Sequence, residues 1–195
     1  EKGNVVTGDH ILYLCGKHLK ERGELTTNTV VTTVMSNLGL HRALHALGIE
    51  TVQTAVGDKY VYERMAQFGD AIGGEQSGHI IFLRDATTGD GLLTSLKVME
   101  VLLAHRGTPV SELAAAMPVF PQVLVNVRVR DKAAVRQDPA IREAEEALGE
   151  EGRVLVRESG TEPVIRVMVE ALTIERCKTY IHGIITAIEK KPCGT

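Results

Sequence analysis

The chain has 195 residues, of which 44% are apolar and 24% charged, and its formal net charge at neutral pH is −3. This composition is ordinary for a globular protein and supplies enough apolar side chains for a buried core. The small negative charge excludes a broad basic surface for nucleic acid, and no apolar run approaches the roughly 20 residues of a membrane-spanning helix. We therefore expect a small-molecule ligand that is held by local positive charge.

Three cysteines, Cys15, Cys177 and Cys193, are odd in number and far apart in the sequence. They form no CxxC pair and no disulfide framework, which is typical of a protein in the reducing cytoplasm. The first nine residues contain no initiating Met and resemble a hairpin or strand from the middle of a fold. We expect a fragment of a longer protein.

The expected elements up to residue 117 alternate helices with strands, which predicts an α/β layered domain. Asp9 stands where it would cap a first helix, and Gly23 ends that helix. Apolar periodicity and β-branched runs then predict, in chain order, a strand at 29–36, a helix from 37 to 47, a strand at 49–56, a short helix at 57–68 and a short strand at 79–83.

A strong helix follows, which Asp90 caps and Gly107 stops. We expect its leucines and Met99 to be core residues. Thr108 and Pro109 start a further short helix, since proline suits the first helical position.

Pro118 and Pro121 punctuate the chain, and we place a domain boundary there. Beyond it we expect a strand at 123–129, a helix from 139 to 148, strands at 153–156 and 164–169, and an amphipathic helix from 174 to about 190. The order β-α-β-β-α predicts a small antiparallel sheet covered by two helices. The predicted fold class is therefore α/β followed by α+β.

The connection between the last two expected strands carries the chemistry of a phosphate site. Arg157 and Arg166 offer planar guanidinium groups that match phosphate oxygens and repel a metal ion. Ser159 and Thr161 add hydroxyl donors, and Gly160 lets the backbone approach a ligand closely. The alternative is an ordinary hairpin turn with solvated charges, because serine, glycine and threonine are common in turns.

A second candidate site is the glycine-rich run Gly-Gly-Glu-Gln-Ser-Gly-His at 73–79. The carboxylate of Glu75 can accept hydrogen bonds from two vicinal sugar hydroxyls, and Ser77 can donate and accept. The alternative is a turn in which Glu75 caps a backbone N–H. His79 either contacts the substrate or is a structural histidine, and Lys59, at a helix start, is either a phosphate contact or a solvated lysine.

The remaining histidines show no spacing typical of a zinc site. His41 and His45 lie four residues apart on an expected helix but lack a nearby third ligand. We expect no metal site in this chain.

Both motifs together resemble the α-D-phosphohexomutase family, in this order and about 80 residues apart. In that family a Gly-Glu-x-Ser-Gly-His loop reads the sugar and an Arg-x-Ser-Gly-Thr-Glu-Pro loop binds phosphate. The resemblance covers essentially the whole chain. It implies that residues 1–19 are the tail of the second domain, that 20–117 form a sugar-recognition domain and that 118–195 form a phosphate-binding domain.

The resemblance implies an enzyme that moves phosphate between a serine and a hexose phosphate through a bisphosphate intermediate. Gln76 makes the sugar motif similar to that of members that interconvert glucosamine 6-phosphate and glucosamine 1-phosphate. Members that act on mannose or glucose phosphates remain an alternative, as does a non-catalytic sugar-phosphate binding module. Family members commonly have arginine where Lys59 stands. Lysine keeps the positive charge but lacks the planar guanidinium that can bind two phosphate oxygens at once.

The family's phosphorylated serine and its Asp-Gly-Asp-x-Asp-Arg loop, which holds Mg²⁺, belong to upstream domains. Neither motif occurs in this sequence. We therefore expect the chain to be inactive by itself, with no catalytic residue and no metal ligand of its own. Its expected partners are a hexosamine phosphate and the upstream domains of the same protein, and not nucleic acid or a membrane.

Overall fold

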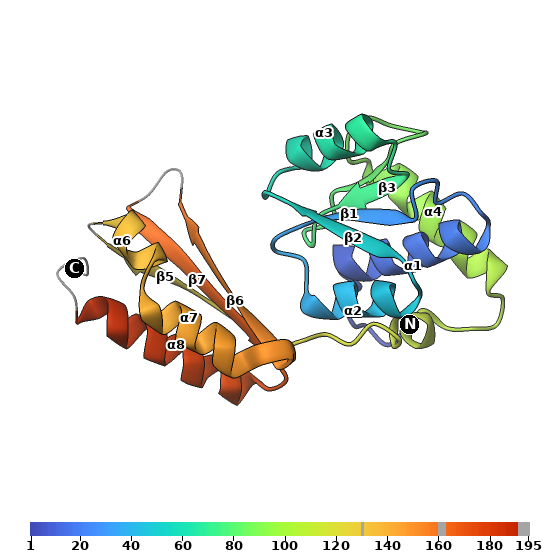
Figure 1. Cartoon of the computed structure of the whole chain (residues 1–195). Coiled ribbons are helices and arrows are strands. Elements are labelled where there is room, and N and C mark those ends of the chain that lie inside the picture. Colours follow the sequence, from blue (N-terminus) through green and yellow to red (C-terminus); the bar gives the residue numbers. More distant parts are fainter. Residues whose placement is uncertain (130, 160–162, 191–195) are drawn as a thin grey trace. The chain divides into compact units, whose positions relative to one another are not determined.

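The computed structural model describes residues 1–129, 131–159 and 163–190. The chain divides into two compact units, Glu1–Val119 and Phe120–Thr195, and each is considered on its own (Figure 1). The division falls between Pro118 and Pro121. None of the helices in the described ranges has the length and apolarity that crossing a bilayer would require.

The first unit is built on a four-stranded mixed sheet with the order β2-β1-β3-β4. Strand β1 pairs in parallel with β2 and β3, whereas β4 runs antiparallel to β3. The strands are β1 (Thr29–Thr33), β2 (Glu50–Thr54), β3 (Ile72–Gly74) and β4 (Ile80–Phe82). Strand β3 overlaps the start of the glycine-rich run at 73–79, where the sequence predicted no strand.

Helices cover both faces of this sheet, as expected for an α/β layered domain. In β1, Val30 packs into the core under α1, α2 and α4, and Val31 packs on the opposite side against α3. The helices are α1 (Gly8–Glu21), α2 (Leu38–Ala46), α3 (Asp58–Phe68), α4 (Gly91–Ala104) and the short α5 (Val110–Ala114).

Helix α1 differs from the sequence expectation in its place and in its cap. Residues 1–19 were assigned to a preceding domain, but Leu12 of α1 is fully buried in the same core cluster as Val30. Thr7 is the N-cap of α1. Asp9 lies in the first turn, where its Oδ2 accepts a hydrogen bond from the backbone N–H of Asn37 at 2.8 Å. Asp9 therefore ties the start of α1 to the start of α2.

Helix α4 begins where Asp90 predicts it, since the Asp90 side chain accepts hydrogen bonds from the first turn. The expectation that Met99 and all leucines of this helix are core residues is wrong. Val101 is buried, but Leu92, Leu96, Met99 and Leu103 are exposed. The helix is apolar on more sides than the unit can cover.

The second unit is a three-stranded antiparallel sheet with the order β5-β7-β6. Helices α7 and α8 pack on one face of it (Figure 1). The elements are β5 (Gln122–Arg128), α6 (Lys132–Arg136), α7 (Pro139–Leu148), the 3₁₀ turn η1 (Gly149–Glu151), β6 (Gly152–Glu158), β7 (Val164–Ala171) and α8 (Ile174–Glu189). The fold is the one expected, with the addition of α6.

The strands of the second unit show the alternation of a sheet that is covered on one side. Val127, Val154, Ile165 and Val167 point toward α7 and α8 and form one buried cluster with them. The residues that alternate with these along each strand, including Arg157 and Arg166, therefore lie on the opposite face.

Replacing Ile165 by alanine should destabilise the second unit alone. Ile165 is fully buried in the second cluster, and removing such a side chain costs about 2–5 kcal/mol through lost burial and a residual cavity. Scanning calorimetry should show a lower transition temperature for the second unit and an unchanged one for the first. Leu124→Ala, on the other face and 40% exposed, is the control. A shift of both transitions by I165A would mean that the units do not unfold separately.

Candidate functional site

A row of polar residues crosses the face of the second sheet that lies opposite α7 and α8. The strand register places Arg157 of β6 directly opposite Arg166 of β7, and Arg166 directly opposite Asn126 of β5. Like charges that face each other across antiparallel strands destabilise a sheet. The sheet therefore holds a concentrated positive charge at this row.

The environment of the two arginines fits an anion site. Burial, and then the neighbouring charge of Arg166, lowers the pKa of Arg157. The Nε atoms of both residues are buried, and neither has a hydrogen-bond partner in the part of the chain that the structure describes. Buried donors without an acceptor cost free energy, and an anion between the two guanidinium groups would supply that acceptor.

Ser159 follows Arg157 at the end of β6 and is 5% exposed. Its backbone N–H donates to the carbonyl of Val164 at 3.0 Å, and its carbonyl accepts from Nζ of Lys132 at 2.8 Å. The other residues of the candidate phosphate loop, Gly160 and Thr161, lie outside the described residues. The structure thus places three of the five predicted phosphate ligands, Arg157, Ser159 and Arg166, at the same end of the sheet, where β6 ends and β7 begins.

The short helix α6 was missed by sequence reasoning, and it holds the start of this loop. Lys132 binds the Ser159 carbonyl, and Nη1 of Arg136 lies 3.6 Å from Oε1 of Glu158. The five residues of α6 are too few to show helical periodicity and carry no motif. The positive charges of Lys132 and Arg136 were the only signal in this segment that pointed to the acidic loop residue Glu158.

The second candidate site is the connection between β3 and β4. The backbone N–H of Glu75 donates to the carbonyl of His79 at 3.0 Å, and that of Gly78 donates to the carbonyl of Glu75 at 3.0 Å. Oε1 of Glu75 accepts from the backbone N–H of Gly57, the N-cap of α3, at 2.9 Å. Glu75 therefore caps a backbone N–H, which is one of the two alternatives raised in the sequence analysis. Its second carboxylate oxygen, Oε2, takes no part in this hydrogen bond.

The three predicted sugar ligands lie together in this connection. Nδ1 of His79 is 3.8 Å from Oε2 of Glu75 and 3.5 Å from Oγ of Ser77. The His79 side chain is 63% exposed, and the Glu75 side chain is 13% exposed. Lys59, one residue into α3, is 73% exposed and lies 3.8 Å from Glu63. The carboxylate is therefore fixed while the imidazole and the hydroxyl face solvent.

Gly8 fixes the sugar loop from a distant part of the sequence. Its N–H donates to the carbonyl of Gln76 at 3.1 Å. A Cβ at this position would lie 2.1 Å from the carbonyl oxygen of Glu75 and 2.8 Å from the nitrogen of Gly78. Only glycine lets the start of α1 approach the loop so closely, and sequence reasoning did not predict this contact.

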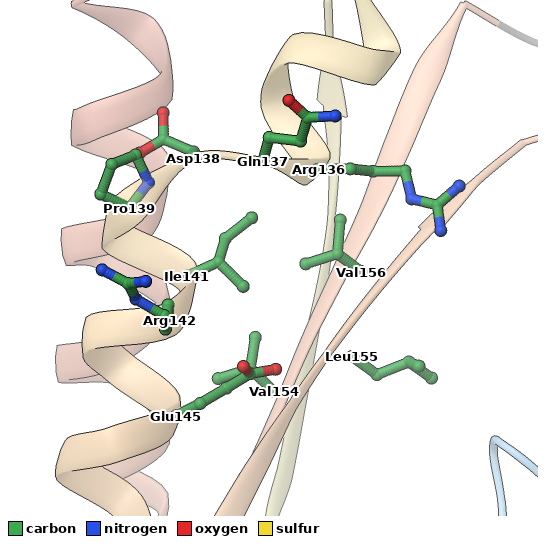
Figure 2. A pocket seen from close by; sticks show the side chains of 10 residues that line it. All are labelled: Arg136, Gln137, Asp138, Pro139, Ile141, Arg142, Glu145, Val154, Leu155 and Val156. Atoms are coloured by element: carbon green, nitrogen blue, oxygen red, sulfur yellow. The ribbon is translucent and has the colours of Figure 1, made fainter.

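A surface hollow of about 550 Å³ lies between α7 and β6. Figure 2 shows Ile141, Val154 and Val156 at its base and the side chain of Arg136 extending over β6. None of the predicted site residues lines it. Within the described ranges, no three His, Cys, Asp or Glu side chains gather as metal ligands would.

The chain matches family models in both units. Residues 7–120 match "Phosphoglucomutase/phosphomannomutase, alpha/beta/alpha domain III", and residues 124–187 match "Phosphoglucomutase/phosphomannomutase, C-terminal domain". It is 57% identical to a phosphoglucosamine mutase of Lachnospira eligens over 195 residues, which covers 98% of this chain and 43% of that protein. The chain thus spans less than half the length of this curated relative.

Solved structures share the fold at lower identity. A phosphoglucomutase/phosphomannomutase family protein of Burkholderia thailandensis superimposes with a TM-score of 0.82 at 22% identity, over 99% of this chain and 44% of that one. N-acetylphosphoglucosamine mutase of Aspergillus fumigatus, in complex with GlcNAc-6P and magnesium, gives a TM-score of 0.75 at 21% identity, over 96% of this chain and 48% of that one.

Replacing Gly8 by alanine should displace the loop at residues 75–78. The added Cβ overlaps backbone atoms, so the loop or the start of α1 must move, at a cost of about 1–3 kcal/mol. Hydrogen exchange should show faster exchange at the Gly78 amide and a lower unfolding temperature of the first unit.

The matched control is Gly91→Ala, at the first residue of α4, where a Cβ meets no atom within 4 Å. That variant should keep the wild-type exchange pattern. Equal behaviour of the two variants would show that Gly8 does not position the loop.

Proposed function

The chain belongs to the phosphoglucomutase/phosphomannomutase family, and we propose that it is the sugar- and phosphate-binding half of an enzyme that interconverts glucosamine 6-phosphate and glucosamine 1-phosphate. The 57% identity to a phosphoglucosamine mutase supports the amino sugar over mannose or glucose. The interconversion passes through a bisphosphate intermediate. By itself, the chain binds ligand and performs no phosphoryl transfer.

The observation that carries this proposal is the arginine pair of the second sheet. Two guanidinium groups face each other across β6 and β7, and each has a buried Nε without a partner among the described residues. A phosphate dianion neutralises both charges and offers enough oxygens for both forks. A metal cation or an uncharged sugar ring does neither.

Arg157 and Arg166 are proposed to hold the phosphate that is not being transferred. Ser159, Gly160 and Thr161 complete this phosphate site with hydroxyl and backbone donors. Hydrogen-bond donors that are fixed on a sheet can bind either phosphate of a bisphosphate sugar, because they contact the phosphate oxygens and not the ring carbon that carries them. The reacting phosphate is thereby placed for transfer at the other end of the ligand.

Glu75, Ser77 and His79 are proposed to bind the sugar hydroxyls. Oε1 of Glu75 accepts a hydrogen bond from the Gly57 N–H, which fixes the carboxylate. Oε2 then accepts a hydrogen bond from a hydroxyl of the sugar. Ser77 and His79 lie within 4 Å of each other and add a hydroxyl and an imidazole beside the carboxylate of Glu75. Lys59 is proposed as a further phosphate contact, from the start of the helix that Gly57 caps.

Magnesium is part of the family's chemistry, and its charge would neutralise the transferring phosphoryl group. The described residues do not fit it: Asp9 bonds to the Asn37 N–H, Asp90 caps α4, and the candidate phosphate site is cationic. We propose that the ion is held by a region outside this chain. The buried thiols of Cys15 and Cys177 agree with a cytoplasmic location.

Replacing Arg157 by alanine should weaken phosphate binding. Lost charge-assisted hydrogen bonds, worth about 1.5–3 kcal/mol, should lower kcat/KM of the longer protein for glucosamine 6-phosphate by about 10- to 150-fold, mainly through KM. The same change should weaken binding of glucosamine 6-phosphate to the 195-residue chain in calorimetry.

Arg142→Ala, at a 77% exposed position on α7, is the matched control and should leave both values unchanged. The proposal fails if R157A binds and turns over like the wild type. If the wild-type longer protein isomerises mannose or glucose phosphates and not the amino sugar, only the choice of substrate is wrong. If it binds sugar phosphate without turnover, it is a binding module.

Replacing Glu75 by glutamine should preserve the fold and lower turnover. The amide oxygen can still accept from the Gly57 N–H, but the charged acceptor for the sugar is lost. We expect kcat/KM of the longer protein to fall by more than about 10-fold with an unchanged melting temperature. Glu146→Gln, at a 72% exposed position on α7, should be silent. An active, folded E75Q protein would leave Glu75 only its capping role.

A further inference from the structure

Strand β6 is an edge of the second sheet, and part of its backbone points away from that sheet. Among the described residues the strand order is β5-β7-β6, so β6 has a ladder on one side only. The N–H of Ser159 donates to the carbonyl of Val164, which makes this a hydrogen-bonded pair, and such pairs alternate along antiparallel strands. The N–H and C=O groups of Val154 and Val156 therefore point outward, where no backbone group of the described ranges pairs with them.

The hollow of about 550 Å³ between α7 and β6 lies along this open edge. The side chains of Val154 and Val156 point to the α7 side of the sheet and form its apolar base together with Ile141 (Figure 2). The volume falls within the range of about 300–1,000 Å³ that is usual for ligand sites. We call the outward edge of β6 and this hollow the β6 groove.

An open strand edge beside an apolar hollow is the arrangement that binds extended peptides by strand addition. The main chain of the peptide hydrogen-bonds to the edge, and every second side chain enters the hollow. Val154 and Val156 each offer one donor and one acceptor for this purpose. A small molecule without a peptide backbone would leave these four groups without partners, so the groove favours a peptide.

The two ends of the β6 groove carry opposite charges. Helix α7 and strand β6 are joined by the short turn η1 and run in opposite directions, so Glu145, in the second half of α7, lies toward the Val154 end. Arg136 lies at the other end, where β6 reaches Glu158. The Arg136 side chain is 60% exposed and is 3.6 Å from Glu158, and exposed pairs of this kind contribute little. Arg136 is therefore free to bind an acidic group of a ligand.

We propose that the β6 groove binds an extended segment of a partner protein as an added antiparallel strand. Two β-branched residues of the segment, two positions apart, pair with Val156 and Val154 and fill the hollow. The antiparallel direction places an acidic residue before them, at Arg136, and a basic residue after them, at Glu145. This site does not depend on the proposed function, because Arg157 lies on the other face of the sheet.

A second copy of the chain fits the β6 groove less well. Symmetric pairing of two β6 edges about Leu155 would set Arg157 opposite Arg153 of the second copy, and like charges in that position destabilise a sheet. It would also bring Glu158 of the second copy to the end that Glu145 lines. The charges of the groove therefore favour a different sequence over its own.

Hydrogen exchange by NMR on the 195-residue chain, with the synthetic peptide acetyl-Glu-Thr-Val-Thr-Val-Thr-Lys-amide, tests the proposal. The Val154 and Val156 amides should exchange fast in the free chain and at least about ten times more slowly with saturating peptide. The Leu155 amide, which points into the ladder, should not change. N-methylation of the first valine removes the donor to the Val156 carbonyl and should weaken binding at least about 10-fold. N-methylation of the threonine between the valines, whose N–H points away from β6, is the matched control and should leave the affinity unchanged.

Variants of the chain test the groove from the other side. Val156→Pro removes an outward N–H at a place where an edge strand tolerates proline, and it should weaken binding at least about 10-fold. Glu145→Lys should weaken it by about 2- to 5-fold, and a peptide that ends in glutamate should regain the loss. Glu146→Lys, at a 72% exposed position on α7, is the control. Arg157→Ala should leave peptide binding unchanged, which separates this site from the proposed phosphate site.

Four outcomes would overturn the proposal. One is no binding of the peptide at about 1 mM, and another is equal binding of the two N-methylated peptides, which would show that no strand is added. A third is protection of the Val154 and Val156 amides that rises with chain concentration without peptide, which would assign the edge to a second copy. The fourth is a longer protein in which these amides are already protected without peptide. Peptide binding in a longer protein that has no mutase activity would contradict the proposed function and support the β6 groove.

Discussion

The repulsion between Arg157 and Arg166 is the constraint around which the second unit is organised. The ladder between β6 and β7 sets the two residues opposite each other, and a one-residue shift of either strand would send its arginine into the core under α7 and α8. The apolar face provides the stability that lets the other face keep two positive charges together. In this way a small sheet holds two like charges opposite each other, and the proposed phosphate site rests on this arrangement.

The candidate sugar site depends on backbone contacts between segments that are far apart in the sequence. The N-cap of α3 donates to Glu75, and Gly8 of α1, which is distant in sequence, contacts the backbone of the same loop. Since the loop has no regular structure beyond β3 and β4, these contacts give the carboxylate its fixed position. A ligand that needs a defined acceptor then pays less to order the site.

Helix α4 shows how burial depends on more than the element itself. Its sequence is that of an interior helix, and the unit fills only the side of Val101. The outward side, with Leu92, Leu96, Met99 and Leu103, is exposed in the first unit. Apolar composition therefore predicted core positions along the whole helix, but the tertiary structure decided which side is buried.

The sequence by itself determined the features whose causes lie within a few residues. Asp90 caps the helix that it was expected to cap, and alternation identified the strands of the second unit. It also identified the motif residues of both candidate sites by their chemistry. Only the tertiary structure decided that Asp9 supports α2, that Gly8 abuts the sugar loop and that Lys132 binds Ser159. Each of these contacts joins residues 27 or more positions apart, and local periodicity and propensity carry no information over that distance.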